Sequence, residues 1–64
     1  MRIYIFVGVY EGIPDLVEVY LEKKRAEKRF QKYTGVSFNQ VEIDRAIKEG
    51  NPEWTGSDIF EREI

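Results

Sequence analysis

The sequence predicts one α+β domain over residues 1–64, in which a three- to four-stranded antiparallel or mixed sheet carries one main helix on one face. Short apolar runs with strand-like alternation come before and after a highly charged, helix-favouring segment, which gives the order β-β-α-β-β. The 64 residues also have room for only one hydrophobic core.

The first strand is predicted at residues 2–10. Its odd positions from 3 to 9 carry isoleucine and valine, and its even positions carry mostly tyrosine and phenylalanine. Because successive side chains of a strand point to opposite faces, both faces of this strand are apolar. We therefore expect a central strand that is covered on both sides. Gly8 interrupts the aromatic face and indicates a bulge or a close approach of the backbone to another segment.

A hairpin and then the main helix follow. Residues 11–15 contain a glycine and a proline, which favour a turn, and residues 16–21 are a second apolar run. Residues 22–33 are rich in strong helix formers, and Ala26, Phe30 and Tyr33 form a narrow apolar stripe.

Residues 37–49 allow two interpretations. We favour a strand over residues 37–43 followed by a helical turn over residues 44–49, because apolar side chains alternate there around a bulge. A helix competes with this interpretation, since Ser37-x-x-Gln40 resembles a capping box. That helix would bury a stripe of three residues and end at a glycine cap: Ile43, Ala46, Ile47 and Gly50.

The C-terminal part is predicted as a loop and a last strand. The loop, residues 51–56, contains the only tryptophan, and the strand covers residues 57–64. We favour Trp54 folding back into the core over Trp54 contacting a partner, because the burial of one tryptophan matters greatly in so small a core.

Three segments resemble a known group of proteins. Residues 19–27 pass from a strand directly into a charged helix with an internal alanine, residues 41–44 read Val-Glu-Ile-Asp, and residues 54–56 read Trp-Thr-Gly. In these features the chain resembles a loose group of small prokaryotic domains of unknown function, some of which carry a Trp-Thr-x-Gly-like segment one residue longer. The resemblance implies the β-β-α-β order and no particular activity, substrate or catalytic residue.

The predicted helix is basic although the whole chain carries a net charge of −2. Five cations are expected on the face opposite its apolar stripe, where they are candidates for contacts with nucleic acid: Lys24, Arg25, Lys28, Arg29 and Lys32. The acidic balance of the chain argues against a dedicated nucleic-acid binder, so we favour a solvated helix face.

Aromatic side chains are the candidates for a partner interface. Those selected are Tyr4, Phe6, Tyr10, Trp54 and Phe60. Rings on a sheet can also stack on bases, but no basic-Gly-aromatic string of the RNA-binding type is present. We therefore expect the rings of the first strand to pack under the helix or against a second subunit.

Residue content excludes several kinds of chemistry. Without cysteine or histidine the chain forms no disulfide, thiolate metal site or His-based catalytic pair. The carboxylates that remain as metal ligands or acid–base groups match no EF-hand spacing: Glu42, Asp44, Glu49, Glu53 and Asp58. We expect no cofactor, no metal and no enzymatic activity.

The N-terminal apolar run is too short to span a membrane and lacks the small-residue cleavage site of a signal peptide, so the expected location is cytoplasmic. A high content of Glu and Lys hints at a thermophilic source.

The expected function follows from how the first strand is covered. One narrow helix covers one face of the sheet, so either the C-terminal segment or a second copy of the chain must cover the other. We expect a non-catalytic structural or protein-interaction module that acts as a homodimer, alone or with another protein. The alternative is weak nucleic-acid binding through the basic helix face.

Overall fold

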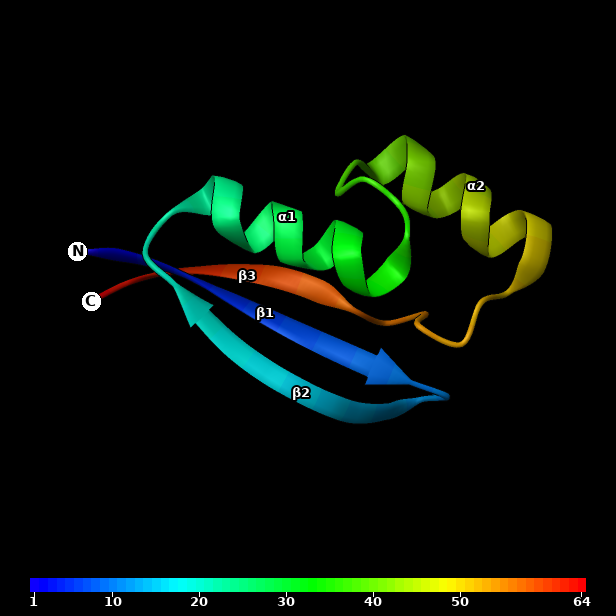
Figure 1. The fold of residues 1–64 in the computed structure, drawn as a ribbon, viewed down its shortest axis with the longest axis horizontal. Helices are drawn as coiled ribbons and strands as arrows, with labels where there is room; N and C mark the ends of the chain where they lie inside the picture. Colours follow the sequence, from blue (N-terminus) through cyan, green and yellow to red (C-terminus); the bar gives the residue numbers. More distant parts are fainter.

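The computed structural model describes residues 1–64 as a three-stranded antiparallel sheet with two helices (Figure 1). The elements in chain order are β1 (Arg2–Tyr10), β2 (Ile13–Tyr20), α1 (Lys23–Thr34), α2 (Gln40–Gly50) and β3 (Asp58–Glu63). The strand order is β2-β1-β3, so β1 is central as the sequence predicted. The α+β class is confirmed, whereas the order β-β-α-β-β with one main helix is wrong, because α2 takes the place of a strand.

The β1–β2 hairpin closes through the two residues Glu11 and Gly12, which both have positive φ angles, 51° and 80°. Tight hairpin turns of this kind match the right-handed twist of the strands. The pairing register shifts between Gly8 and Val9, so a bulge lies where the sequence indicated one. Gly8 is also buried, because Tyr33 and Leu16 pack over it.

Helix α1 lies across one face of the sheet (Figure 1). The predicted stripe is confirmed, since Ala26 and Phe30 are fully buried and Tyr33 is half-buried. Gly35 caps the helix with a φ of 78°, and its amide donates to the carbonyl oxygen of Gln31 at 2.7 Å.

An aromatic cluster around Phe30 forms the core. Its ring meets those of Phe6, Phe38 and Trp54 edge-on, with centroid distances of 6.1, 5.0 and 6.3 Å. Trp54 is 8% exposed, so the prediction that it folds back into the core is confirmed. Ser57 fastens the same loop to the sheet, because its hydroxyl oxygen accepts from the amide of Val9 at 2.8 Å.

The predicted strand over residues 37–43 is wrong, because the structure has helix α2 from Gln40. The side chain of Asn39 caps this helix by accepting from the amides of Val41 and Glu42 at 2.9 and 3.3 Å. The competing helix interpretation placed the apolar stripe correctly, since its three residues are the half-buried ones of α2. The caps of that interpretation were wrong at both ends. Asn39 is the N-cap in place of Ser37, and Asn51, with a φ of 41°, is the C-cap in place of Gly50.

Helix α2 stands away from the rest of the fold (Figure 1). No Cα atom of α2 lies within 8 Å of a Cα atom in the strands or in α1. The molecule is correspondingly elongated, with a longest dimension of 37 Å. Helix α2 therefore covers neither face of the sheet.

The C-terminal segment joins the sheet as β3 instead of crossing it. It pairs with β1 from Asp58 to Glu63, and the amide of Ile64 donates to the carbonyl oxygen of Met1 at 2.7 Å. Both chain ends consequently lie side by side (Figure 1). The second face of the sheet is thus left without the C-terminal cover that the sequence allowed.

Candidate functional site

The sheet face opposite α1 is apolar, and neither helix covers it. Its central row is formed by cross-strand partners, because Ile5 pairs with both Val19 and Phe60. Side chains of directly paired residues lie on the same face of a sheet. By this register the face, which we call the open sheet face, consists of Ile3, Ile5, Val7, Val17, Val19 and Phe60.

The outer strands expose these side chains most. Val17 and Val19 on β2 are 62% and 59% exposed, and Phe60 on β3 is 40% exposed. The three β1 residues are half-buried by their neighbours in the sheet. Full burial of one such side chain contributes about 1.5–3 kcal/mol. A partner that covers the open sheet face therefore gains several favourable contacts at once.

Two charged residues of β3 flank Phe60 on this face. Asp58 pairs with Val7 and Arg62 with Ile3, so both lie on the open side. The guanidinium of Arg62 lies 5.9 Å from the centroid of the Phe60 ring. Arg62 is also the only arginine without an ion pair, since Arg2, Arg25, Arg29 and Arg45 each contact a carboxylate. Asp58 likewise contacts no cation.

The structure separates the aromatic residues that the sequence selected as a partner interface. Phe6 is fully buried beneath α1 and Trp54 lies in the core, so neither is accessible to a partner. Tyr4 shares the face of Phe6, and Tyr10 is 52% exposed at the end of β1. Only Phe60 belongs to the open sheet face.

Ile3, Ile5 and Val7 of β1 belong to the open sheet face but were not among the interface residues that the sequence predicted. Gly8 was the available signal, because a residue without a side chain makes room for a helix on its own face. The even positions of β1 from Tyr4 to Gly8 are therefore the covered ones. The odd positions before the bulge, which are Ile3, Ile5 and Val7, are left for a partner.

Three of the five candidate nucleic-acid contacts form a free basic row on α1. The row consists of Lys24, Lys28 and Lys32, which are exposed and have no carboxylate within 4 Å. Arg25 is exposed too but pairs with Glu22 at 2.7 Å. This row lies on the helix face directed away from the sheet.

Arg29 does not belong to the free basic row. Its Nε atom donates to Oε1 of Glu18 at 2.7 Å, and its guanidinium lies 5.8 Å from the ring centroids of Phe6 and Tyr33. Because Arg29 lies next to Ala26, Phe30 and Tyr33 on the helix, its side chain extends toward β2. Only 27% of the side chain is exposed, so Arg29 is held against β2 and its role as a nucleic-acid contact stays a prediction.

Glu18 is held by two donors. The hydroxyl of Tyr20 donates to its Oε1 atom at 2.8 Å, beside the Arg29 contact. These hydrogen bonds and the positive charge lower the pKa of the Glu18 carboxyl below its ordinary value of 4.5. The same hydrogen bond raises the pKa of the Tyr20 hydroxyl above 10.0. This network stabilises the packing of α1 on β2.

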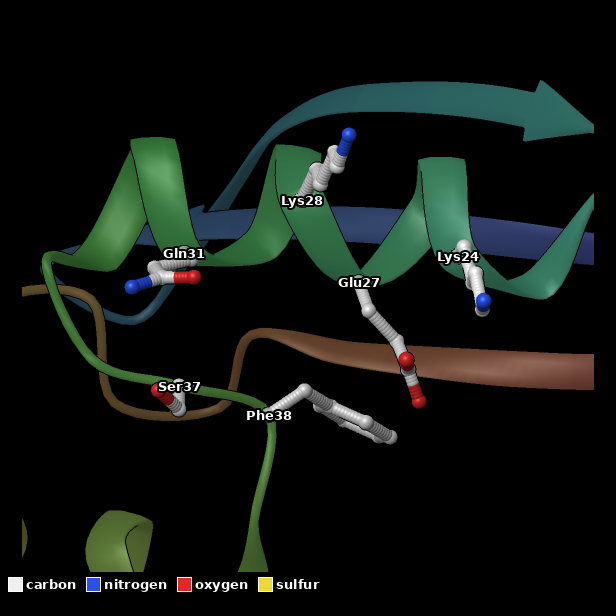
Figure 2. Close-up of a pocket in the computed structure, with 6 residues that line it drawn as sticks. All are labelled: Lys24, Glu27, Lys28, Gln31, Ser37 and Phe38. Atoms are coloured by element: carbon white, nitrogen blue, oxygen red, sulfur yellow. The ribbon is translucent and has the colours of Figure 1, made fainter.

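A shallow hollow lies between α1 and the following loop (Figure 2). Its volume is about 270 Å³, and it is lined by Lys24, Glu27, Lys28, Gln31, Ser37 and Phe38. Figure 2 shows the Glu27 side chain pointing toward Phe38 and ending beside its ring, while Lys28 points to the opposite side of the helix. The cations therefore do not converge in the hollow, and a carboxylate lies where an anion would have to bind.

No three carboxylates come together in an arrangement that could hold a metal ion. No helix in the structure combines the length and apolar character needed to cross a membrane.

Comparisons of this chain with protein-family models, with curated proteins and with solved structures gave no match. The resemblance to small prokaryotic domains therefore stays a prediction.

Proposed function

We propose that the chain is a non-catalytic protein-interaction module that acts as a homodimer through its open sheet face. The observation that carries the proposal is the absence of any cover over Val17, Val19 and Phe60. The C-terminal segment was the one alternative cover, and it lies within the sheet as β3. A cytoplasmic location and the absence of catalysis belong to the same proposal.

A second copy is the partner that this face fits best. Two-fold interfaces use the same patch on both subunits, so an apolar patch can bury itself against its own copy. Face-to-face packing of two sheets is a common way to build a core about 10 Å thick. The two small domains would share one additional core in this way, which compensates for the limited burial in a chain of 64 residues.

The test compares two valine substitutions by sedimentation over about 1–500 µM, the range in which modest interfaces dissociate. Val19→Lys places a charge on the open sheet face and should give a monomer at concentrations where the natural chain is a dimer. Val41→Lys is the control, because Val41 is a similarly exposed valine, 64% against 59%, on the distant helix α2. A natural chain that sediments as a monomer throughout would refute the proposal.

The free basic row supports a second candidate function, which is weak binding of nucleic acid. Three unpaired lysines at i, i+4 and i+8 follow one side of α1, where phosphates can approach them. Charge reversal at Lys24 and Lys28 should weaken binding to a duplex and reduce its dependence on salt. The control reverses Lys23 and Lys48, which changes the net charge equally. Equal effects of the two double variants, or no binding at low salt, would exclude this function.

A further inference from the structure

We infer that two copies pack their open sheet faces about a two-fold axis along the row Val19–Ile5–Phe60, so that Asp58 of each copy faces Arg62 of the other. This inference depends on the proposed self-association and specifies its geometry. It assigns the two charged residues of the face the role of selecting the partner and its orientation.

The pairing register supplies the row. Ile5 lies opposite Val19 on one side and opposite Phe60 on the other, so these three residues cross the sheet at one level. Asp58 and Arg62 lie two residues before and after Phe60, which places each about 6.6 Å from the row in opposite directions. A rotation of 180° about an axis along this row therefore places Asp58 of one copy over Arg62 of the second copy, and Arg62 of the first over Asp58 of the second.

Two sheets stacked face to face can also be related by an axis that runs along the strands. That axis would place β3 of one copy over β2 of the other. Asp58 would then lie against Val17, and Arg62 against Leu21, the apolar residue that follows β2. Because burial of an unpaired charge is strongly unfavourable, this arrangement is disfavoured. The axis across the strands pairs both charges and keeps the apolar residues together.

Both charges lack an ion pair, although each makes one local hydrogen bond: Oδ1 of Asp58 accepts from the amide of Ile59 at 2.7 Å, and Nη1 of Arg62 donates to the carbonyl oxygen of Glu61 at 2.9 Å. Asp58 has no cationic partner in its own chain, and Arg62 is the one unpaired arginine. The guanidinium of Arg62 already lies on the open face, over the ring of Phe60. Packed sheets are about 10 Å apart, a distance that a long arginine and a short aspartate can span together.

The size of the face sets the expected affinity. Three strands about 4.8 Å apart and six residues of about 3.3 Å each cover roughly 15 by 20 Å. That is about 300 Å² per copy and about 600 Å² for both copies, which is below the roughly 1,200–2,000 Å² of standard interfaces and in the class of weak, transient ones, so a dissociation constant in the high micromolar range is expected.

Charge exchange tests the axis directly. Asp58→Arg alone creates two Arg–Arg contacts across the axis, and Arg62→Asp alone creates two Asp–Asp contacts. Each variant should therefore dissociate about tenfold or more readily than the natural chain. An equimolar mixture should form a heterodimer, because the introduced arginine of one chain then faces the introduced aspartate of the other, and the remaining natural Arg62 faces the remaining natural Asp58. The double variant D58R/R62D should dimerise again.

Matched controls and milder variants complete the test. Glu49→Arg and Arg45→Asp on α2 make the same kinds of charge change away from the face, and their mixture should show no preferential heterodimer. Should a reversed variant fail to fold by circular dichroism, Asp58→Asn and Arg62→Gln replace it. Each neutral variant should weaken the dimer, and the double neutral variant should be no weaker than either one.

The outcomes separate the two proposals. Suppose that Val19→Lys dissociates the dimer, but that mixing the two charge variants forms no more heterodimer than chance predicts. The proposed axis is then refuted, and self-association through the open sheet face stands. If the natural chain is monomeric, both fall. Preferential heterodimer formation in the mixture supports both.

Discussion

Gly8 shows how a single position decides which face of β1 is covered. A Cβ atom at this position would lie 2.9 Å from Cζ of Tyr33 and 3.2 Å from Cγ of Leu16. Because glycine has no Cβ atom, α1 can pack against the sheet as closely as it does. The face that carries Gly8 is therefore the helix-facing one.

Gly8→Ala should lower the free energy of unfolding by about 1–2 kcal/mol, as overpacking typically does. The Tyr33 ring can move aside only by weakening its edge-on contact with Phe6 and the 3.0 Å hydrogen bond to Asp15. Urea denaturation measures the change. Gly50→Ala is the control, since nothing lies within 4 Å of a Cβ atom there and alanine favours a helix. Equal or greater stability of Gly8→Ala would contradict the close packing.

The pKa values of Glu18 and Tyr20 predict how stability depends on pH. The pKa of Glu18 is lower in the folded chain than its ordinary value of 4.5. The stability from its ionised form is therefore present above pH 4.5 and is lost as the pH falls through the lowered pKa. The pKa of Tyr20 is raised above 10.0 by its bond to Glu18, so that contribution is present below pH 10.0 and is lost as the pH rises through the raised pKa.

Glu18→Gln should therefore be less stable than the natural chain near neutral pH, and the difference should shrink as the pH falls below 4.5. Urea midpoints measured at several pH values give this comparison. Glu42→Gln is the control, because its ion pair with Arg45 is exposed at 3.7 Å and contributes little. A difference that does not change with pH would show that Glu18 acts by shape alone.

At the scale of elements, the hairpin and α1 could be predicted because their periodicities are unambiguous. Segment 36–44 could not, because its apolar positions fit both a strand and a helix. Two contacts favour the helix in the structure. The side chain of Asn39 accepts hydrogen bonds that cap the helix and compete with strand pairing, and the ring of Phe38 packs on that of Phe30 with their centroids 5.0 Å apart. A contact between residues of different elements leaves no trace in a local pattern, so sequence reasoning chose the strand.

The open sheet face was likewise predictable only in part. The apolar character of both faces of β1 showed that two covers were needed. The apolar pattern of β1 did not indicate which of its faces packs against α1. It also did not indicate that the C-terminal segment pairs with β1 as a strand. The sequence favoured the aromatic residues as an interface, yet large rings such as Phe6 also contribute most to a hydrophobic core.

The capping of α2 predicts a local effect. Asn39→Ala should weaken the helix by about 1 kcal/mol, the usual value of a lost N-cap. Because α2 has no Cα atom within 8 Å of the strands or of α1, the loss should appear as faster amide exchange in α2 while global stability changes little. Ser37→Ala is the control, since the serine hydroxyl makes no capping bond. A stronger effect of Ser37→Ala would contradict this cap.

For the whole molecule, the arrangement separates its two candidate surfaces. Helix α1 lies between them, with its buried stripe on the sheet and its free basic row outward, while the open sheet face lies on the other side (Figure 1). In the proposed homodimer the two open sheet faces meet, so both basic rows remain accessible on opposite outer sides. Self-association and phosphate binding are consequently compatible, and the second would be bivalent in the dimer.

Self-association also predicts that thermal stability depends on protein concentration. Binding to the folded state alone stabilises it, and each tenfold increase in concentration above the dissociation constant adds about 1.4 kcal/mol per dimer. Shared between two chains of this size, that corresponds to a rise of about 3–6 °C in Tm. Scanning calorimetry at several concentrations should show this rise for the natural chain and for Val41→Lys, but not for Val19→Lys. A midpoint that is independent of concentration in all three proteins would mean that the open sheet face binds no second copy.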